Sequence, residues 1–255
     1  KYLSQEGVKE LNLIAQDLSY YGFDIYKEHL LPELLKQLAE MNNFPWIRLL
    51  YNYPSKFPKE ILEIMKNYPS ICNYLDIPFQ HISDSVLKTM RRGISKKNTY
   101  KLINFIKSEL PESTLRTTLM VGHPGEDEKA FNELINFVKN TQFDRLGVFT
   151  YSEEEGTYSA RQYKDQIPER IKQERADEIM KLQQSISRKK NKEKVGLRLN
   201  TLIDSEDENY FYGRTESDAP EVDNNVLINK TEETSNKIAL GEFHPVTITE
   251  AFDYD

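Results

Sequence analysis

Short apolar segments alternate with amphipathic helical patterns along the first part of the chain, and this alternation constrains the fold more than any other feature. The apolar segments are rich in residues that favour strands, and they occupy residues 7–16, 46–51, 73–80, 115–122 and 144–152. Helical patterns lie between them at residues 30–41, 59–68, 83–92, 95–110 and 127–140. Alternating strands and helices predict βα units, in which helices cover a parallel sheet.

Five βα units are too few to close a barrel of eight, so the predicted α/β fold is a partial, open parallel barrel over residues 1–160. In parallel sheets, ligands bind at the carboxyl ends of the strands, which meet at one mouth. Polar residues follow the predicted strands: Gln16 and Asp17, Tyr51 and Asn52, Gln80 and His81, Gly122 to Glu126, and Tyr151 to Glu155. The sequence therefore predicts a ligand site at this mouth.

The remainder of the chain changes character twice. Residues 161–190 are predicted to be a helical connection packed on the barrel. Four aliphatic residues of this region lie on roughly one helical face: Ile171, Ile179, Leu182 and Ile186. Residues 191–255 contain short strand-like segments separated by Gly, Asp and Asn turns, with no helical pattern between them, which predicts a small all-β barrel.

Negative charge is concentrated in this last segment. Residues 191–255 hold 15 Asp and Glu against 6 Lys and Arg, whereas residues 1–190 hold 26 against 28, so the overall net charge of -7 arises from the C-terminal quarter. An acidic surface repels a phosphate backbone and attracts basic partners. A solvated acidic surface without any partner explains the charge equally well.

Compartment and redox state follow from what the sequence lacks. It contains no apolar stretch of the roughly 18 residues that a membrane span needs and no signal peptide pattern, so we expect a cytoplasmic location without membrane association. Cys72 is the only cysteine, which excludes an internal disulfide and an all-cysteine metal site within these residues, and we interpret it as an inert buried thiol. The chain starts at Lys1 without an initiator methionine, so we expect it to be part of a longer protein.

Six segments together carry a resemblance to a known family. They are ELNLIAQDLSYYG, IRLLYNYP, YLDIPFQHISDSVLKTMRRG, LRTTLMVGHPGE, FDRLGVFTYSEEEGT and GRTESDAPEVDNNV. In this order, across nearly the whole chain, they resemble the radical-SAM methylthiotransferase family. Members of that family have an N-terminal domain with one iron–sulfur cluster, a radical-SAM partial barrel with a second cluster, and a C-terminal TRAM β-barrel, and this chain resembles the second and third parts.

The resemblance implies cofactors that these residues do not hold by themselves. The family's CxxxCxxC loop, which binds the barrel's cluster, is expected upstream of Lys1, and Cys72 alone cannot replace its three ligands. The full-length protein is therefore expected to use S-adenosyl-L-methionine and two [4Fe-4S] clusters. The fragment by itself is expected to have no cluster and no activity.

Two branches of the family differ in substrate. One modifies an adenosine of transfer RNA, and the other adds a methylthio group to the β-carbon of an aspartate in a small-subunit ribosomal protein. The acidic barrel suits a basic ribosomal protein better than RNA, and the segment DAPEVDNNV resembles the protein-modifying branch. We expect that ribosomal protein as substrate, an electron donor as partner and no nucleic acid; the transfer RNA branch and a noncatalytic RNA-binding module are the alternatives.

The implied reaction is radical chemistry performed by the cofactors. A 5′-deoxyadenosyl radical removes hydrogen from an unactivated carbon, sulfur comes from the second cluster, and a second S-adenosylmethionine supplies the methyl group. No proton that a base could abstract is involved, which agrees with the lack of a convincing nucleophile and base pair in the sequence. A hydrolase would need such a pair or a metal-ligand set, so no catalytic residue is assigned.

Position at the mouth, combined with the resemblance, predicts the binding residues. Those expected to contact S-adenosylmethionine are Gln16, Asp17, Gln80, Arg116, Gly122, Gly125 and Glu126. Arg116 could instead form a structural ion pair, and Glu126 could instead cap its helix. Arg91 and Arg92 are expected to bind the acidic substrate group, or else to complement the dipole at a helix end.

The charged residues around the turn at residues 122–126 indicate which ligand charge the site would accept. A helix N-terminus normally suits an anion such as phosphate. Here the first turn carries Glu126, Asp127 and Glu128, which would repel one. Together with the resemblance, this favours a neutral or cationic ligand, namely the sulfonium cofactor S-adenosylmethionine. His81 is interpreted as a strand-end histidine with its hydrogen bonds satisfied.

Overall fold

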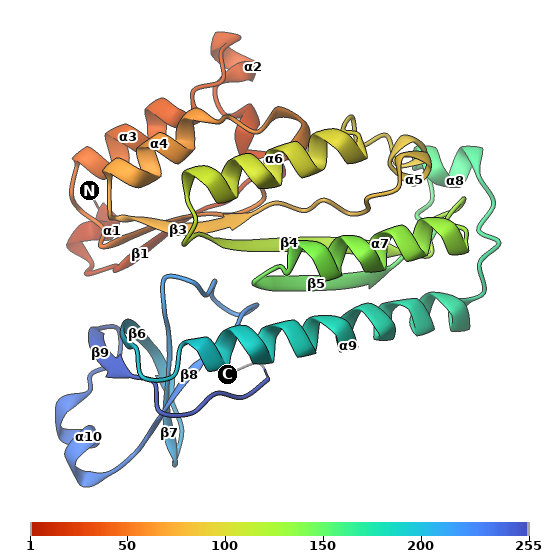
Figure 1. Cartoon of the computed structure of the whole chain (residues 1–255). Helices are drawn as coiled ribbons and strands as arrows, with labels where there is room; N and C mark the ends of the chain where they lie inside the picture. The colour runs from red at the N-terminus through yellow and green to blue at the C-terminus, as the bar shows by residue number, and fades with distance from the viewer. Residues whose placement is uncertain (1, 254–255) are drawn as a thin grey trace.

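A five-stranded parallel sheet forms the larger part of the molecule, whose computed structural model describes residues 2–253. Its strands are β1 Glu10–Leu13, β2 Trp46–Leu49, β3 Ile71–Asp76, β4 Thr114–Val121 and β5 Arg145–Thr150. They lie in chain order, β1-β2-β3-β4-β5, and each neighbouring pair is parallel (Figure 1). The predicted open, partial barrel is confirmed.

Helices cover one face of this sheet. The longer ones are α3 Leu31–Glu40, α4 Glu60–Asn67, α6 Lys96–Glu109 and α7 Glu128–Thr141. Shorter helices lie in the connections and do not all cover the sheet: α1 Tyr2–Gln5, α2 Phe23–Tyr26, α5 Asp84–Thr89 and α8 Tyr158–Gln162, with 3-10 turns η1 Leu18–Tyr20 and η2 Pro54–Lys56. Along β4, Leu115, Leu119 and Val121 are buried in the core beneath the helices, and Arg116 points to the opposite side, because side chains alternate along a strand. We call this opposite side the inner face of the sheet.

Helix α9, Glu169–Glu193, runs beside α7 and β5 and leads into the C-terminal domain (Figure 1). Ile179 and Ile186 of the predicted apolar face are buried in the core. Lys172 and Arg175 are buried as well, and the amphipathic pattern did not predict this.

The C-terminal domain is a curled antiparallel sheet with the strand order β8-β7-β6-β9. Its strands are β6 Arg198–Glu206, β7 Tyr210–Arg214, β8 Val226–Asn229 and β9 Phe243–Thr247. The predicted all-β fold is confirmed, but the expectation of no helix between strands was wrong. A short helix, α10 Glu232–Lys237, forms because Thr231 and Thr234 make a reciprocal capping box at its start.

The C-terminal domain packs against the inner face of the sheet, at the amino-terminal ends of its strands and therefore opposite the mouth (Figure 1). An apolar cluster joins the two parts: Trp46, Cys72 and Tyr74 of the sheet pack with Leu202 and Ala219. The Trp46 ring also meets Phe243 edge to face, with 4.7 Å between ring centroids. Cys72 is buried in this cluster, in agreement with its interpretation as an inert thiol, and burial raises its pKa to about 12.

Candidate functional site

The segments after β3 and β4 lie side by side at the mouth because their backbones continue the sheet. The amide of Gln80 donates to the Thr118 carbonyl at 2.9 Å, and the Gln80 carbonyl accepts from the Met120 amide at 2.7 Å. Gln80 holds a left-handed backbone with φ of 67°, which is unfavourable for a residue with a side chain and is maintained here by these two bonds. Its half-buried side chain is thereby held at the predicted site; contact with the cofactor stays a prediction.

Glu126 occupies a buried cluster of charged side chains beneath the turn. Its Oε1 accepts from Arg175 at 2.7 Å and from the Gly122 amide at 3.1 Å, and its Oε2 lies 3.2 Å from His81 Nε2. The side chain is fully buried, so its observed partners belong to the protein. The helix-cap alternative was wrong, because Asp127 takes the N-cap position and accepts from the Ala130 amide at 2.7 Å.

His81 has a defined tautomer in this cluster. Its Nδ1 accepts from the Ser83 amide at 3.0 Å, so Nδ1 carries a lone pair and the proton of the neutral ring is on Nε2, facing Glu126. The histidine therefore lies between the segment after β3 and the turn after β4. Only its Nδ1 is hydrogen-bonded: within residues 2–253, the buried Nε2 faces Glu126 Oε2 at an ion-pair distance without forming a hydrogen bond, so the expectation of a histidine with all its hydrogen bonds satisfied was wrong.

Helix α9 supplies cations beneath the same turn, and sequence reasoning missed both of them. Lys172 donates to the Tyr151 carbonyl at 3.0 Å and pairs with Asp165 and Glu169. Arg175 joins Glu126 as described. The available signal was spacing: Lys172 and Arg175 lie on the helical face of Ile179, where cations interrupt an apolar stripe.

The two glycines of the turn face different surroundings. Gly122 has φ of 77°, and a Cβ built on it would lie only 2.3 Å from Lys172 Cγ. The small size of Gly122 therefore allows the Lys172 side chain to approach its backbone closely. Gly125 has φ of 92° and is exposed, and a Cβ there would have no neighbour nearer than Thr89 Cγ2 at 4.0 Å, so this position is open to a ligand.

Gln16 and Asp17 follow β1 and differ in accessibility. Gln16 is exposed at the mouth. Asp17 caps the turn η1, since its Oδ1 accepts from the Ser19 amide at 3.0 Å and from the Ser19 hydroxyl. One carboxylate oxygen of Asp17 is thus engaged within the chain, and its contact with the cofactor stays a prediction.

Arg91 and Arg92 are neighbours in sequence but lie in different surroundings. Arg92 donates to the Pro78 carbonyl at 2.6 Å and stacks on Tyr53, which connects the segments after β2 and β3. Burial lowers the pKa of Arg92, although Tyr53 and Asp17 oppose the shift. Arg91 is exposed, and its guanidinium lies 3.3 Å from the centroid of the Tyr158 ring. Of the pair, only Arg91 is exposed, and contact of either arginine with a substrate stays a prediction.

Arg116 forms the structural ion pair that was its alternative interpretation. Its Nη1 lies 2.6 Å from Asp223 Oδ1, and its Nε lies 3.7 Å from Asp76 Oδ1. Burial alone would lower the pKa of Arg116, but Asp223, Tyr74 and Asp76 together raise it, so the guanidinium is held in its charged form. In the register of the sheet Arg116 lies opposite Asp76, the last residue of β3, and its contact with the cofactor stays a prediction.

Three buried acceptor atoms that lack hydrogen-bond partners in the described part of the chain lie on or just after β1, β2 and β3. Asn12 Oδ1, Asn52 Oδ1 and Asp76 Oδ1 are buried and make no hydrogen bond within residues 2–253. Burial raises the pKa of Asp76, although Arg116 opposes the shift. Such a site suits a ligand that brings donors and positive charge.

Comparisons with known proteins define the family. The family model described as "Radical SAM superfamily" matches residues 2–138, and the one described as "TRAM domain" matches residues 195–255. The chain belongs to the radical SAM superfamily. The domain boundaries predicted at residues 160 and 190 stay predictions.

Curated relatives match the whole chain. "Ribosomal protein uS12 methylthiotransferase RimO" of Bacteroides thetaiotaomicron is 49% identical over 255 residues, which is 100% of this chain and 58% of that protein. The protein of the same name from Christiangramia forsetii is 50% identical over 253 residues, or 99% of this chain and 55% of that protein. The chain thus spans little more than half the length of these relatives.

Among solved structures, the fold is similar to that of coproporphyrinogen III oxidase (HemN) from Escherichia coli, described as a radical SAM enzyme. The TM-score is 0.50 at 18% identity, covering 61% of this chain and 37% of that one, so the likeness concerns the fold alone. Within residues 2–253, no helix is long and apolar enough to cross a membrane.

The superfamily implies S-adenosylmethionine and an iron–sulfur cluster, and the described residues fit only the first. The acceptor atoms of Asn12, Asn52 and Asp76 match the ammonium, sulfonium and hydroxyl groups of S-adenosylmethionine. For the cluster, the described part of the chain contains no group of three or more His, Cys, Asp or Glu that could hold a metal, and its one cysteine is buried in the apolar cluster with Trp46.

Proposed function

We propose that this chain is the central and C-terminal part of a methylthiotransferase that acts on ribosomal protein uS12 in the cytoplasm. The observation that carries the proposal is the similarity of 49–50% to the RimO proteins along essentially the entire chain, including both domains. The modified group would be the β-carbon of an aspartate, as the family resemblance implies. The chain alone would be inactive, because its described residues lack cluster ligands.

The chain's own contribution would be to bind and orient S-adenosylmethionine and substrate. When bound, the cofactors supply the radical and sulfur chemistry. Gln80 and Gln16 would contact the S-adenosylmethionine from two sides of the mouth, and the open Gly125 would allow a close backbone approach. The acceptors of Asn12, Asn52 and Asp76 would receive its donors.

Arg91 would contact the substrate carboxylate. Its guanidinium is exposed and oriented by the Tyr158 ring, so little side-chain freedom would be lost on binding. Arg92 would act indirectly, by tying the segments after β2 and β3 together.

The surface of the C-terminal domain supports a basic partner. Part of its acidic surplus is used internally, since Asp218 and Asp223 are engaged by arginines of the sheet. Other acidic residues remain exposed: Asp204, Glu206, Asp207, Glu208, Glu221, Glu232, Glu233, Glu242 and Glu250. This surface would attract a Lys- and Arg-rich protein and repel RNA.

Mass spectrometry of uS12 tests the proposal. In a host strain that lacks the gene, uS12 should lose the mass of one methylthio group, and the natural gene should restore it. A Gln80→Ala variant should restore much less, whereas Gln173→Ala, at an exposed glutamine of α9, should restore it fully. Unmodified uS12 together with methylthiolated transfer RNA adenosine would instead identify the transfer RNA activity.

A further inference from the structure

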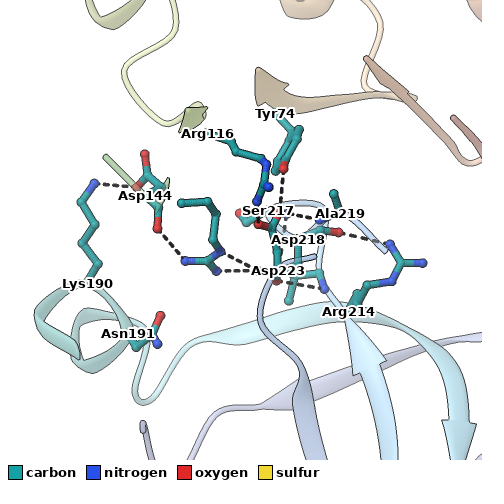
Figure 2. Close-up of polar contacts among 12 residues, drawn as sticks. Tyr74, Arg116, Asp144, Lys190, Asn191, Arg214, Ser217, Asp218, Ala219 and Asp223 are labelled. Carbon is teal, nitrogen blue, oxygen red and sulfur yellow. Dashed lines mark hydrogen bonds and ion pairs between the residues drawn. The ribbon is translucent and has the colours of Figure 1, made fainter. Parts of the chain in front are cut away.

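The last residue of β7 and the loop that follows it contact the inner face of all five parallel strands. We call residues 214–223 the floor loop, since the C-terminal domain lies opposite the mouth (Figure 1). Figure 2 shows this loop against Tyr74 and Arg116 of the sheet. The contacts are Arg214 to Glu10 of β1 at 2.8 Å, Arg48 of β2 to the Glu216 carbonyl at 2.7 Å, Tyr74 of β3 to Asp223 at 2.5 Å, Arg116 of β4 to Asp223 at 2.6 Å, and Arg145 of β5 to Asp218.

The groups in these contacts are almost entirely withdrawn from water. The side chains of Arg48 and Asp223 are 0% and 1% exposed, and those of Arg145 and Asp218 are 6% and 4% exposed. A buried charge without its partner is strongly unfavourable. The inner face therefore depends on the floor loop for charge compensation, and the C-terminal domain completes the half barrel as well as presenting a surface.

The contact at Arg116 continues from the floor toward the mouth. Asp223 Oδ1 binds Arg116 Nη1 at 2.6 Å, and Arg116 Nε lies 3.7 Å from Asp76 Oδ1, an ion-pair distance. Asp76 is the last residue of β3, and its Oδ2 accepts from the Tyr51 amide at 3.2 Å. Three charged side chains thus connect the C-terminal domain to the segment after β2.

That segment has a backbone that needs support. Tyr51 has φ of 59°, a left-handed conformation that is costly for a bulky residue. The Asp76 carbonyl also accepts from the Asn52 amide at 2.8 Å, and the Tyr51 carbonyl accepts from the Leu18 amide at 3.4 Å. Displacement of Asp76 would therefore disturb the segments after β1 and β2 together.

We propose that Asp223 is a positioning residue that acts through Arg116 and Asp76 on Tyr51 and Asn52, so that docking of the C-terminal domain sets the geometry of the mouth. The contacts of Asp223, Arg116 and Asp76 support this positioning role whatever reaction the protein catalyses. Its meaning for methylthiolation rests on the proposed function: the domain that would bind the substrate protein is also the domain that holds the mouth in shape.

Hydrogen exchange in the intact natural protein tests this without measuring catalysis. Asp223→Asn should speed exchange of the Tyr51 and Asn52 amides by roughly tenfold or more, since local opening of that segment becomes easier. The matched control is Asp218→Asn, which removes a buried carboxylate of the same loop from Arg145 on β5. It should leave exchange at Tyr51 and Asn52 near the natural rate.

Trp46 reports docking independently, since its ring packs on Phe243 of the C-terminal domain. Equal acceleration of exchange at Tyr51 and Asn52 in both variants would refute a specific route through Arg116. An unchanged exchange rate in Asp223→Asn would refute it as well, provided that the Trp46 emission of this variant equals that of the natural protein. If Asp223→Asn does not fold, Arg116→Lys serves instead, because lysine keeps the charge but cannot engage Asp223 and Asp76 at once. It should accelerate the same two amides, and an unchanged rate would overturn the proposal. Failure to modify uS12 would bear on the proposed function alone.

Discussion

Replacement of Glu126 by glutamine is expected to destabilise the barrel rather than to weaken a ligand contact. Glu126 is fully buried and its carboxylate meets Arg175, the Gly122 amide and His81. Removing one member of a buried ion pair costs about 3–5 kcal/mol, because the other charge is left uncompensated. Arg175 keeps its bonds to the Glu126 carbonyl and to Glu128, so we expect the lower end, about 3 kcal/mol.

Glu128→Gln is the matched control, because it removes the second carboxylate from the same arginine. Glu128 is 78% exposed and lies 2.7 Å from Arg175 Nη2. An exposed pair contributes about 0–1 kcal/mol, so this variant should remain close to the natural protein.

Urea denaturation of the two variants, followed by circular dichroism, measures the difference. Glu126→Gln should lower the midpoint clearly while Glu128→Gln does not. Equal midpoints for the two variants, combined with weaker S-adenosylmethionine binding in Glu126→Gln, would refute the structural role and favour the direct cofactor contact that the sequence predicts.

Three further predictions concern Gly122, Asp218 and Cys72. Gly122→Ala combines a left-handed backbone with a clash against Lys172, so it should cost about 2–4 kcal/mol in the same urea assay, against about 1–2 kcal/mol for the open Gly125→Ala. Burial alone would raise the pKa of Asp218, but the opposing charge of Arg145 is among the interactions that hold this pKa below its usual value. The carboxylate therefore stabilises domain docking above about pH 4, and that stabilisation is lost as the pH falls further. Trp46 emission should report that loss in the natural protein, and the same acid transition in Asp218→Asn would contradict it. Burial raises the pKa of the Cys72 thiol to about 12, so it should react with a disulfide reagent at pH 8 only after denaturant is added, and rapid reaction of the native protein would contradict this.

The fold could be predicted to a large extent because strands and helices have different periods. Each predicted strand and long helix of the barrel was found, with ends displaced by a few residues. The largest displacement was at β3, which the apolar run placed at 73–80 and which ends at Asp76. Beyond Asp76 the Ile77 amide donates to the Arg116 carbonyl at 3.0 Å, and Gln80 forms an isolated bridge with Leu119. Pro78 has no amide hydrogen to donate and Gln80 has a left-handed backbone, so the regular strand does not continue.

The candidate site was less predictable, because sequence position shows which end of a strand a residue follows but not where its side chain points. Gln16, Gln80, Gly125 and Arg91 lie at the mouth in accessible or half-buried positions. Glu126 and Arg116 instead meet charges from α9 and from the floor loop, which are distant in sequence. Contacts between charges about 50 and 107 residues apart leave no local pattern that periodicity could reveal.

The carboxylates of the acidic C-terminal quarter fall into two groups with different functions. Counting alone assigns every carboxylate to a surface that attracts a basic partner. Asp218 and Asp223 do not belong to that surface, because each is buried against an arginine of the sheet. Under the proposed function, neutralising the exposed carboxylates at Glu206 and Glu208 should weaken binding of uS12 with little effect on docking. Neutralising Asp223 should instead alter the mouth while the surface charge is retained. The two sets are separable by mutation, so recognition and positioning can be measured independently in the same domain.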